Sequence, residues 1–145
     1  MPSTTPWTKD ALVALAEAGY RRGGARKAVV ELLGRQNCCL SAQEIHDGLR
    51  RARRPVGVAS VYRALDALID LRLVKRVDAG DGIARFEPAA ADGDHHHHVV
   101  CRDCGKVESF SDSRLESAID RVAGGLGYSV DDHEVVLTGA CADCS

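Results

Sequence analysis

Two pairs of cysteines near the C-terminal end of the chain have the spacing of a metal-binding motif. The pairs are Cys101 with Cys104 and Cys141 with Cys144. A CxxC turn directs two thiolates at one point while its backbone amides stabilise the sulfur charge, and two such turns complete a tetrahedral S₄ shell around Zn²⁺. A redox pair or a chance repeat is the alternative, but two pairs in one short segment favour structural zinc. Because a closed S₄ shell has no open coordination position, this site would not be catalytic by itself.

Four consecutive histidines, His95 to His98, lie just before the first cysteine pair. A purification tag is normally longer and terminal, whereas this run leads directly into an apolar strand-like segment. In an extended segment, the first and third histidines would face one way and the second and fourth the other, so one strand could supply two metal sites. Four imidazoles would also suit a pH sensor, but other ligand types nearby favour metal binding. Those further candidate ligands are Glu87, Glu116 and His133.

The first half of the chain has the pattern of short helices followed by a β-hairpin. Apolar residues at helical spacing predict helices over about 8–20, 25–35 and 58–71, and a capping-box pair, Ser41 and Glu44, predicts the start of another. Two β-like runs, 73–77 and 83–87, are joined by turn residues. This order is the plan of a winged helix-turn-helix domain.

The sequence pattern of the second half predicts a small α/β unit after a linker. Strands over 97–101 and 106–110 flank the first cysteine pair, a helix spans about 112–126, and a last strand covers 134–138. Ser113 and Glu116 offer a second capping box at the start of that helix. We therefore expect an α+β protein with a winged-helix domain over 1–88, a hinge over 89–94 and an α/β domain over 95–145.

The charge of the 145-residue chain is divided in the same way. The net charge of −2 argues against a nucleic-acid partner, but residues 1–88 carry 15 Lys and Arg against 10 Asp and Glu, and residues 89–145 carry 4 against 11. A basic first half and an acidic second half suggest different partners, although chance segregation of solvated faces is the alternative. No apolar run approaches the roughly 20 residues that span a bilayer, and no secretory signal is evident, so we expect a cytoplasmic protein with no membrane partner.

Three signatures make the sequence similar to the ferric uptake regulator family, which includes iron, zinc, manganese, nickel and peroxide sensors. Residues 58–65, VASVYRAL, resemble the recognition helix of the family, and residues 95–106, HHHHVVCRDCGK, resemble its metal-binding segment. The third signature is His133 ahead of residues 139–144, GACADC. The resemblance covers nearly the whole chain in the same order. It implies a homodimer in which a winged helix binds double-stranded DNA and the α/β domain dimerises and holds metal.

The resemblance also implies DNA-contacting residues. Tyr62 would contact a thymine methyl group, and Arg63 would pair with a phosphate or a base edge. Arg21 matches a basic residue that reaches toward the minor groove. A half-buried structural role is the alternative for Tyr62.

For metals, the resemblance implies three sites. The structural zinc would be held by Cys101, Cys104, Cys141 and Cys144. The sensing site would consist of Cys39, Glu87, His96 and His98. A further site in the second domain would consist of His95, His97, Glu116 and His133. A solvated helix carboxylate is the alternative for Glu116.

The sequence departs from the family pattern in ways that concern the sensed metal. Cys39 stands where many members carry histidine, and a soft thiolate favours zinc over ferrous iron. Many zinc sensors carry a cysteine shortly before the histidines, and residues 88–94 contain none. Glu87 matches the iron-sensor pattern, whereas peroxide sensors favour aspartate there. We expect regulatory Zn²⁺, with Fe²⁺ as the alternative.

The predicted function is a metal-dependent repressor of metal-uptake genes that binds a palindromic, A·T-rich operator and is not an enzyme. A bound metal would fix the hinge and so set the spacing of the two reading helices of a dimer. A small metallohydrolase and a metal-storage protein are the alternatives, but neither explains the basic first half. Salt-dependent affinity for an operator duplex would separate the regulator from both.

Overall fold

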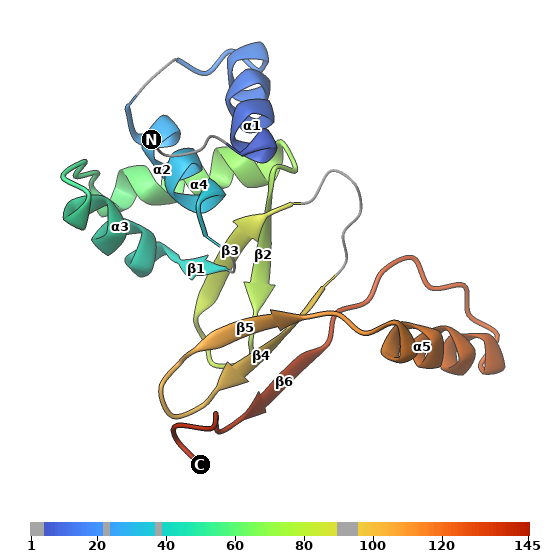
Figure 1. The fold of residues 1–145 in the computed structure, drawn as a ribbon. Helices are drawn as coiled ribbons and strands as arrows, with labels where there is room; N and C mark the ends of the chain where they lie inside the picture. Colours follow the sequence, from blue (N-terminus) through green and yellow to red (C-terminus); the bar gives the residue numbers. More distant parts are fainter. Residues whose placement is uncertain (1–4, 22–23, 37–38, 90–95) are drawn as a thin grey trace. The chain divides into compact units, whose positions relative to one another are not determined.

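The computed structural model describes residues 5–21, 24–36, 39–89 and 96–145. The chain forms two compact units, which we call unit 1 (Met1–Asp94) and unit 2 (His95–Ser145) (Figure 1). The predicted hinge over 89–94 lies outside the described residues except for Ala89, whose amide donates to the carbonyl of Leu73 at 2.9 Å. In the described parts of the chain, no helix is both long enough and apolar enough to cross a bilayer.

Unit 1 contains helices followed by a β-hairpin. Its elements are α1 (Pro6–Glu17), α2 (Gly24–Gly34), β1 (Leu40–Ser41), α3 (Ala42–Arg51), α4 (Val58–Asp70), β2 (Val74–Asp78) and β3 (Ala84–Pro88). The strands form an antiparallel sheet in the order β1-β3-β2. The winged helix-turn-helix fold expected for the N-terminal half is confirmed.

Helix α4 supplies the centre of the unit 1 core. Its residues Val61, Leu65 and Leu68 are at most 1% exposed. Burying each of these side chains stabilises the fold by about 1.5–3 kcal/mol. Tyr62 follows Val61 but is 51% exposed, because neighbouring residues on a helix point in different directions. The helix therefore packs with one face and leaves the other available to a partner.

Helix α3 begins at the capping box that the sequence predicts. The Ser41 hydroxyl accepts from the Glu44 amide at 3.1 Å, and the Glu44 carboxylate accepts from the Ser41 amide at 3.0 Å. Ser41 also ends β1, in which Leu40 pairs with Phe86 and Ser41 with Arg85. Strand β1 is not predicted from the sequence, because a strand of two residues is too short to show an alternating pattern.

The turn between β2 and β3 is held by two aspartates. Asp78 accepts from the Gly80 amide at 3.0 Å, and Asp81 accepts from the Ile83 amide at 3.1 Å. The Arg85 side chain, only 5% exposed, donates to both carboxylate oxygens of Asp81 at 2.8 and 3.2 Å. This hydrogen-bonded pair holds the pKa of Asp81 below its ordinary value. The turn is thereby tied to β3.

Unit 2 is a small α/β unit. Its elements are β4 (His97–Cys101), β5 (Val107–Phe110), α5 (Ser113–Gly125) and β6 (Val136–Gly139). Strand β4 is central, antiparallel to β5 and parallel to β6. Together with unit 1, this confirms the expected α+β fold, in which a winged-helix unit precedes a small α/β unit.

The N-terminus of α5 differs from the prediction. Asp112 is the N-cap, and its carboxylate accepts from the amides of Arg114 and Leu115 at 2.8 and 3.2 Å. The capping box predicted from Ser113 and Glu116 is therefore wrong. An aspartate immediately before the serine satisfies the same amides, because a short carboxylate is an equally good N-cap acceptor.

Helix α5 buries none of its residues in the single chain. The apolar side chains of Val122, in α5, and Leu126, directly after it, are 60% and 70% exposed. Within residues 96–145, the only buried hydrophobic residues are Val100 and Cys101. Unit 2 therefore has too small a core of its own to account for a stable fold, and a metal or a partner is expected to supply the rest.

Candidate metal centres and nucleic-acid interface

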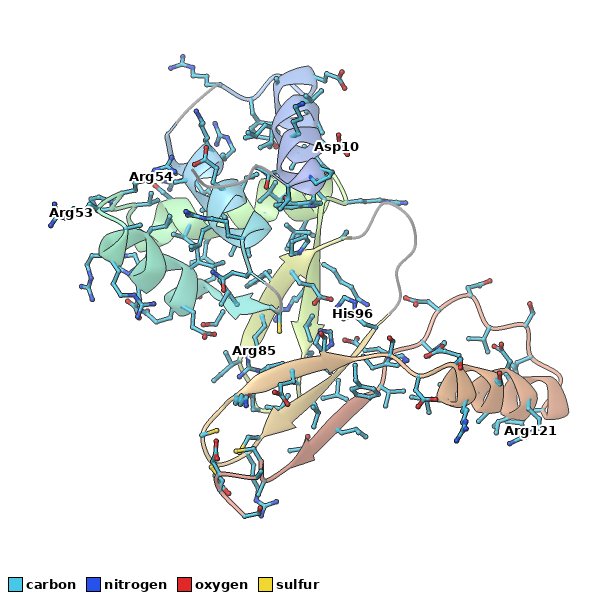
Figure 2. The ribbon with its side chains drawn as sticks, viewed as in Figure 1. Asp10, Arg53, Arg54, Arg85, His96 and Arg121 are labelled. Atoms are coloured by element: carbon cyan, nitrogen blue, oxygen red, sulfur yellow. The ribbon has the colours of Figure 1, made fainter. Side chains whose placement is uncertain are left out.

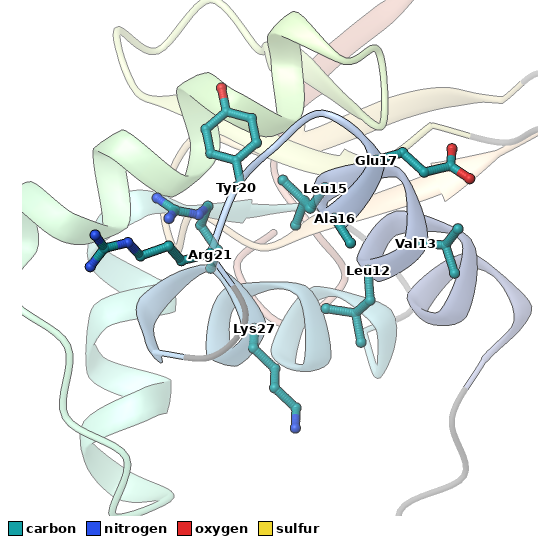
Figure 3. Close-up of a pocket in the computed structure, with 9 residues that line it drawn as sticks. Leu12, Val13, Leu15, Ala16, Glu17, Tyr20, Arg21 and Lys27 are labelled. Carbon is teal, nitrogen blue, oxygen red and sulfur yellow. The ribbon is translucent and has the colours of Figure 1, made fainter.

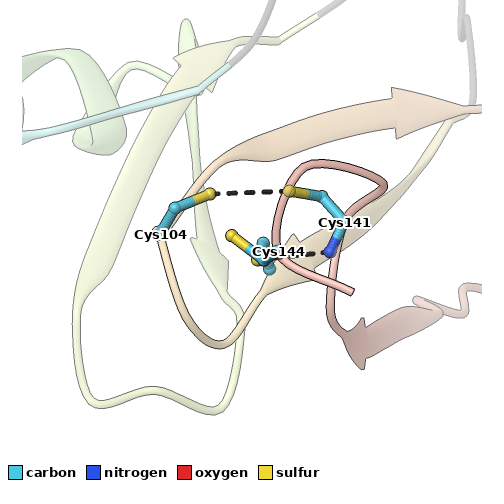
Figure 4. A group of neighbouring side chains, drawn as sticks. Cys104, Cys141 and Cys144 are labelled. Atoms are coloured by element: carbon cyan, nitrogen blue, oxygen red, sulfur yellow. Dashed lines mark hydrogen bonds between the residues drawn. The ribbon is translucent and has the colours of Figure 1, made fainter.

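The four cysteines of the two CxxC pairs converge at one end of the unit 2 sheet. Strand β4 ends at Cys101, and its parallel pairing with β6, in the register Cys101 to Gly139, brings the second pair beside the first. The four sulfurs lie within 4.8 Å of one another, and those of Cys104 and Cys141 are 3.8 Å apart (Figure 4). A tetrahedral Zn²⁺ with bonds of about 2.3 Å requires sulfurs about 3.8 Å apart. The cluster thus fits a structural zinc ion.

The negative charge that ionised thiols bring to this cluster favours the binding of a cation. Amides of Cys104 and Cys141 donate toward the Cys101 sulfur and lower the pKa of that thiol to about 6. The neighbouring thiols, Cys141 foremost, raise the pKa of Cys144 to about 12. One sulfur is therefore ionised near neutral pH, whereas the last keeps its proton until a positive charge compensates the others. Binding of Zn²⁺ would supply that charge and release protons.

A second cluster joins β4 to α5 and to the segment before β6. The Glu116 carboxylate lies 2.6 Å from His97 Nε2 through one oxygen and 2.6 Å from His133 Nε2 through the other. The Val135 amide donates to His97 Nδ1 at 3.1 Å, which leaves the ring proton on Nε2, toward Glu116. A metal that binds this Nε2 must displace that proton, so its affinity would depend on pH. His95, the fourth predicted ligand, lies outside the described residues.

The structure brings together part of the predicted sensing site within unit 2. The rings of His96 and His98 lie edge to face with centroids 5.1 Å apart, and His98 is fully buried. In unit 1, Glu87 in β3 is 4% exposed and Cys39, just before β1, is 6% exposed. Because these residues come from two units, the four-ligand sensing site stays a prediction.

The predicted DNA contacts lie at the surface of unit 1. Tyr62 and Arg63 are exposed on α4, and Arg63 donates to the Ser60 hydroxyl at 3.0 Å. Arg21 is exposed after α1 and lines a cavity of about 520 Å³ formed by α1 and α2 (Figure 3). Near it, the Tyr20 ring lies 4.9 Å from the Arg26 guanidinium carbon, which braces the segment from which Arg21 projects.

The sequence profile of the ferric uptake regulator family matches residues 17–138. The chain belongs to this family. The solved structure of the Vibrio cholerae ferric uptake regulator is 32% identical, with a TM-score of 0.79 over 89% of this chain and 98% of that chain. The structure of the Helicobacter pylori regulator Fur, reported with three functional metal binding sites, is 26% identical, with a TM-score of 0.82 over 94% of this chain and 93% of that chain. The Bacillus subtilis peroxide operon regulator is 31% identical over 94% of this chain and 92% of its own length.

Membership of the ferric uptake regulator family makes this chain a metal-responsive, DNA-binding transcriptional regulator and not an enzyme. The metallohydrolase alternative is therefore wrong. An iron regulator and a peroxide regulator match the chain at almost the same identity, 32% and 31%. Overall similarity thus identifies the family but does not separate the signals that its members sense.

Two features that support the metal clusters were not predicted from the sequence. One is the Val135 amide, which orients the His97 ring, and the other is the Asp112 cap, which frees the Glu116 carboxylate to contact imidazoles. A backbone amide carries no signal in a sequence pattern. The aspartate does, because Asp is a preferred N-cap residue and directly precedes the helix.

Proposed function

We propose that this protein is a homodimeric repressor of metal-uptake genes that binds a palindromic, A·T-rich operator when Zn²⁺ occupies its sensing site. The observation that carries the proposal is the alternation of histidines from His96 into the first residues of β4. The His97 ring contacts Glu116, whereas the rings of His96 and His98 lie next to each other. The segment from His96 into β4 therefore offers histidines to two separate ligand sets just before the first cysteine of the S₄ cluster.

The proposed sensing site couples the two units. Cys39 and Glu87 belong to unit 1, and His96 and His98 belong to unit 2. A metal that binds all four fixes the relative orientation of the units and hence the separation of the two α4 helices in a dimer. Because two DNA half-sites have a set spacing, metal and operator favour the same conformation, and each tightens the binding of the other.

The proposed dimer forms through unit 2. Three of its apolar side chains are 60–71% exposed, namely Val122, Leu126 and Tyr128. In a single chain in water, the hydration of this apolar surface is unfavourable. A second copy that packs against this surface buries them and adds the core that unit 2 lacks. The structural zinc at the S₄ cluster then stabilises the same unit from its other end.

The proposed DNA contacts follow from the exposed face of α4. Tyr62 and Arg63 stand on the side of the helix opposite its buried residues, so the helix can enter the major groove without unfolding the core. Arg21 extends the interface toward the minor groove. We assign base reading to Tyr62 and Arg63, and positioning on the duplex to Arg21.

The choice of zinc over iron depends on Cys39. A thiolate ligand among two imidazoles and a carboxylate favours Zn²⁺, whereas the buried carboxylate of Glu87 also suits Fe²⁺. An iron-responsive regulator is therefore the second candidate, favoured by Glu87 and by similarity to the Vibrio cholerae iron regulator. Both candidates use the same two-unit site.

The deciding experiment titrates protein that retains its structural zinc but lacks the exchangeable metal. Zn²⁺, Fe²⁺ and Mn²⁺ are added separately while affinity for an operator, selected from a randomised duplex library, is followed. We expect Zn²⁺ to restore tight binding at the lowest free concentration. Tightest activation by Fe²⁺ would favour the second candidate, and operator binding that is unchanged by chelation would overturn the metal-dependent mechanism.

Two variants separate the structural site from the sensing site. Cys101→Ser removes a ligand of the S₄ cluster and should unfold unit 2 or dissociate the dimer. His96→Ala should leave a folded dimer that keeps its structural zinc but no longer responds to added metal. Equal effects of the two changes on oligomeric state and metal response would contradict this division of roles.

A further inference from the structure

Four arginines within five positions surround the end of α3. Arg50 and Arg51 lie in its last turn, and Arg53 and Arg54 lie in the turn that leads to α4 (Figure 2). The Arg50 side chain is 72% exposed, and its ion pair with Asp47 is long, at 3.8 Å. Arg51 and Arg53 are also exposed, and the described residues form no ion pair with either. This turn therefore presents positive charge that the protein itself neutralises only in part.

The backbone at Arg53 adds a second observation. Arg53 has a φ of 58°, in the left-handed region, and closes the end of α3 with hydrogen bonds from its amide to Arg50 and from the Arg54 amide to Leu49. This is the position at which helices most often carry glycine, which adopts the conformation without strain. An arginine here costs conformational free energy that glycine would not, and its side chain is exposed.

Arg72 offers a comparison within the same chain. It has a φ of 59° and closes the end of α4 with the same pattern, from its own amide to Ile69 and from the Leu73 amide to Leu68. A cation at either position also interacts favourably with the carboxyl end of its helix. That effect is common to both arginines, so any difference in function between them must come from where each lies.

Arg53 and Arg72 lie at opposite ends of the reading helix. Arg54, the neighbour of Arg53, lines a cavity of about 500 Å³ together with Gly57 and Ser60 at the start of α4. Ser60 in turn accepts from Arg63, one of the proposed base-reading residues. Arg72 lies two residues after Asp70, the last residue of α4, which has 13 residues and is therefore about 20 Å long.

We infer that Arg50, Arg51 and Arg53 form a contact surface for the phosphates of duplex DNA, beside the segment read by α4. This inference rests on the proposed function and extends it from the reading helix to the turn before it. Guanidinium groups match phosphate oxygens in a two-pronged geometry, and their charge is incompletely neutralised here. Because phosphates carry no sequence information, this surface contributes affinity for any duplex and positions α4 rather than selecting bases.

The test compares Arg53→Gly with Arg72→Gly. Both changes relieve the same left-handed backbone and remove the same charge, so both variants should melt at or above the temperature of the wild type. Binding is measured over a range of salt concentrations to a short mixed-sequence duplex and to the operator selected as above. Arg53→Gly should weaken binding to both duplexes by about five- to tenfold at 0.1 M salt and reduce the salt slope by about one contact per chain. Arg72→Gly should change neither the affinity for the two duplexes nor the salt slope.

A second change, Arg51→Gln, tests the surface without altering the backbone preference. It should weaken binding to the two duplexes by the same factor, so the ratio of specific to non-specific affinity stays constant. Equal DNA affinity of the Arg53 and Arg72 variants would show that Arg53 serves only the helix end and would overturn the inference. A loss confined to the selected operator would overturn it as well, because it would mean base reading.

The outcome is distinguishable from failure of the proposed function. Arg63→Gln should abolish preference for the selected operator whether or not the arginine surface contacts phosphates. If the wild type bound that operator no better than mixed sequence with metal present, the proposed function would fail, and the inference with it. If the wild type preferred the operator but the Arg53 and Arg51 variants bound both duplexes as tightly as the wild type, the inference would fail and the proposed function would remain.

Discussion

The carboxylate of Glu116 lies 2.6 Å from Nε2 of the fully buried His97. This contact joins the first turn of α5 to the central strand of unit 2, two elements that otherwise share little buried surface. The second carboxylate oxygen contacts His133, so one side chain connects three segments of the chain. The cluster is therefore a candidate metal site, and it also connects α5 to the sheet of unit 2.

We predict that Glu116→Gln weakens Zn²⁺ binding at this cluster by at least about tenfold, because the amide cannot replace a charged ligand. The zinc at the S₄ cluster should remain. Metal content per chain and calorimetric titration measure both effects. The control is Glu108→Gln, which removes the same charge from an exposed residue paired with Lys106 at 3.3 Å. Wild-type metal content and affinity in the Glu116 variant would contradict the assignment.

We predict that Asp81→Asn lowers the free energy of unfolding by about 1–2 kcal/mol at neutral pH, because Arg85 loses its charged acceptor. Since folding lowers the pKa of Asp81, this stabilisation is present above the unfolded value near 3.8 and disappears as the pH falls through the folded pKa. Urea unfolding of both proteins between neutral and acidic pH measures the difference, which should converge toward zero in acid. Asp78→Asn, whose amide oxygen can still accept from the Gly80 amide, should cost less.

We predict that Leu126→Glu prevents dimer formation, because it places a charge on the exposed apolar face of α5. The fold of the single chain should survive, since the side chain is 70% exposed there. Sedimentation equilibrium gives the mass in solution, and circular dichroism reports the fold. Arg121→Glu is the matched control on the same helix, and its exposed side chain lies off the apolar stripe. A dimeric Leu126 variant would argue for a different interface.

We predict that Tyr62→Ala weakens operator binding by about tenfold or more, whereas Tyr62→Phe retains most of the affinity, because the aromatic ring makes the thymine contact. Thermal melting should be nearly unchanged in both, as expected for a side chain that is 51% exposed. Electrophoretic mobility shifts with the selected operator measure the affinity. A large fall in melting temperature would instead support a structural role for the tyrosine.

Much of the architecture was predictable because it is encoded locally. The Ser41 and Glu44 capping box begins α3, and apolar residues at helical spacing predict a helix over 58–71, as the structure confirms. Strand β4 spans the segment expected from its apolar run after the histidines. In each case the signal and the structure involve residues within one or two turns of each other, so the pattern is sufficient.

The missed features depend on partners that are distant in sequence or on competing local choices. Strand β1 exists only because Leu40 and Ser41 meet β3 more than forty residues later. The capping box at Ser113 was wrong because Asp112 occupies the cap while Glu116 turns to His97 and His133. A sequence pattern ranks the local candidates for a cap or a strand. It does not show which of these residues instead contacts a residue that is distant in sequence.

By itself, the sequence predicted that two CxxC pairs and a run of histidines would bind metal, and it showed that a basic helical half precedes an acidic one and that the chain resembles the ferric uptake regulators. Only the tertiary structure decided that the parallel register of β4 with β6 brings the two cysteine pairs within 4.8 Å, and that α5 presents its apolar side to the exterior. The physical reason is that ligand type and helix periodicity are properties of neighbouring residues, whereas a coordination shell and an exposed surface arise from pairings that folding alone makes.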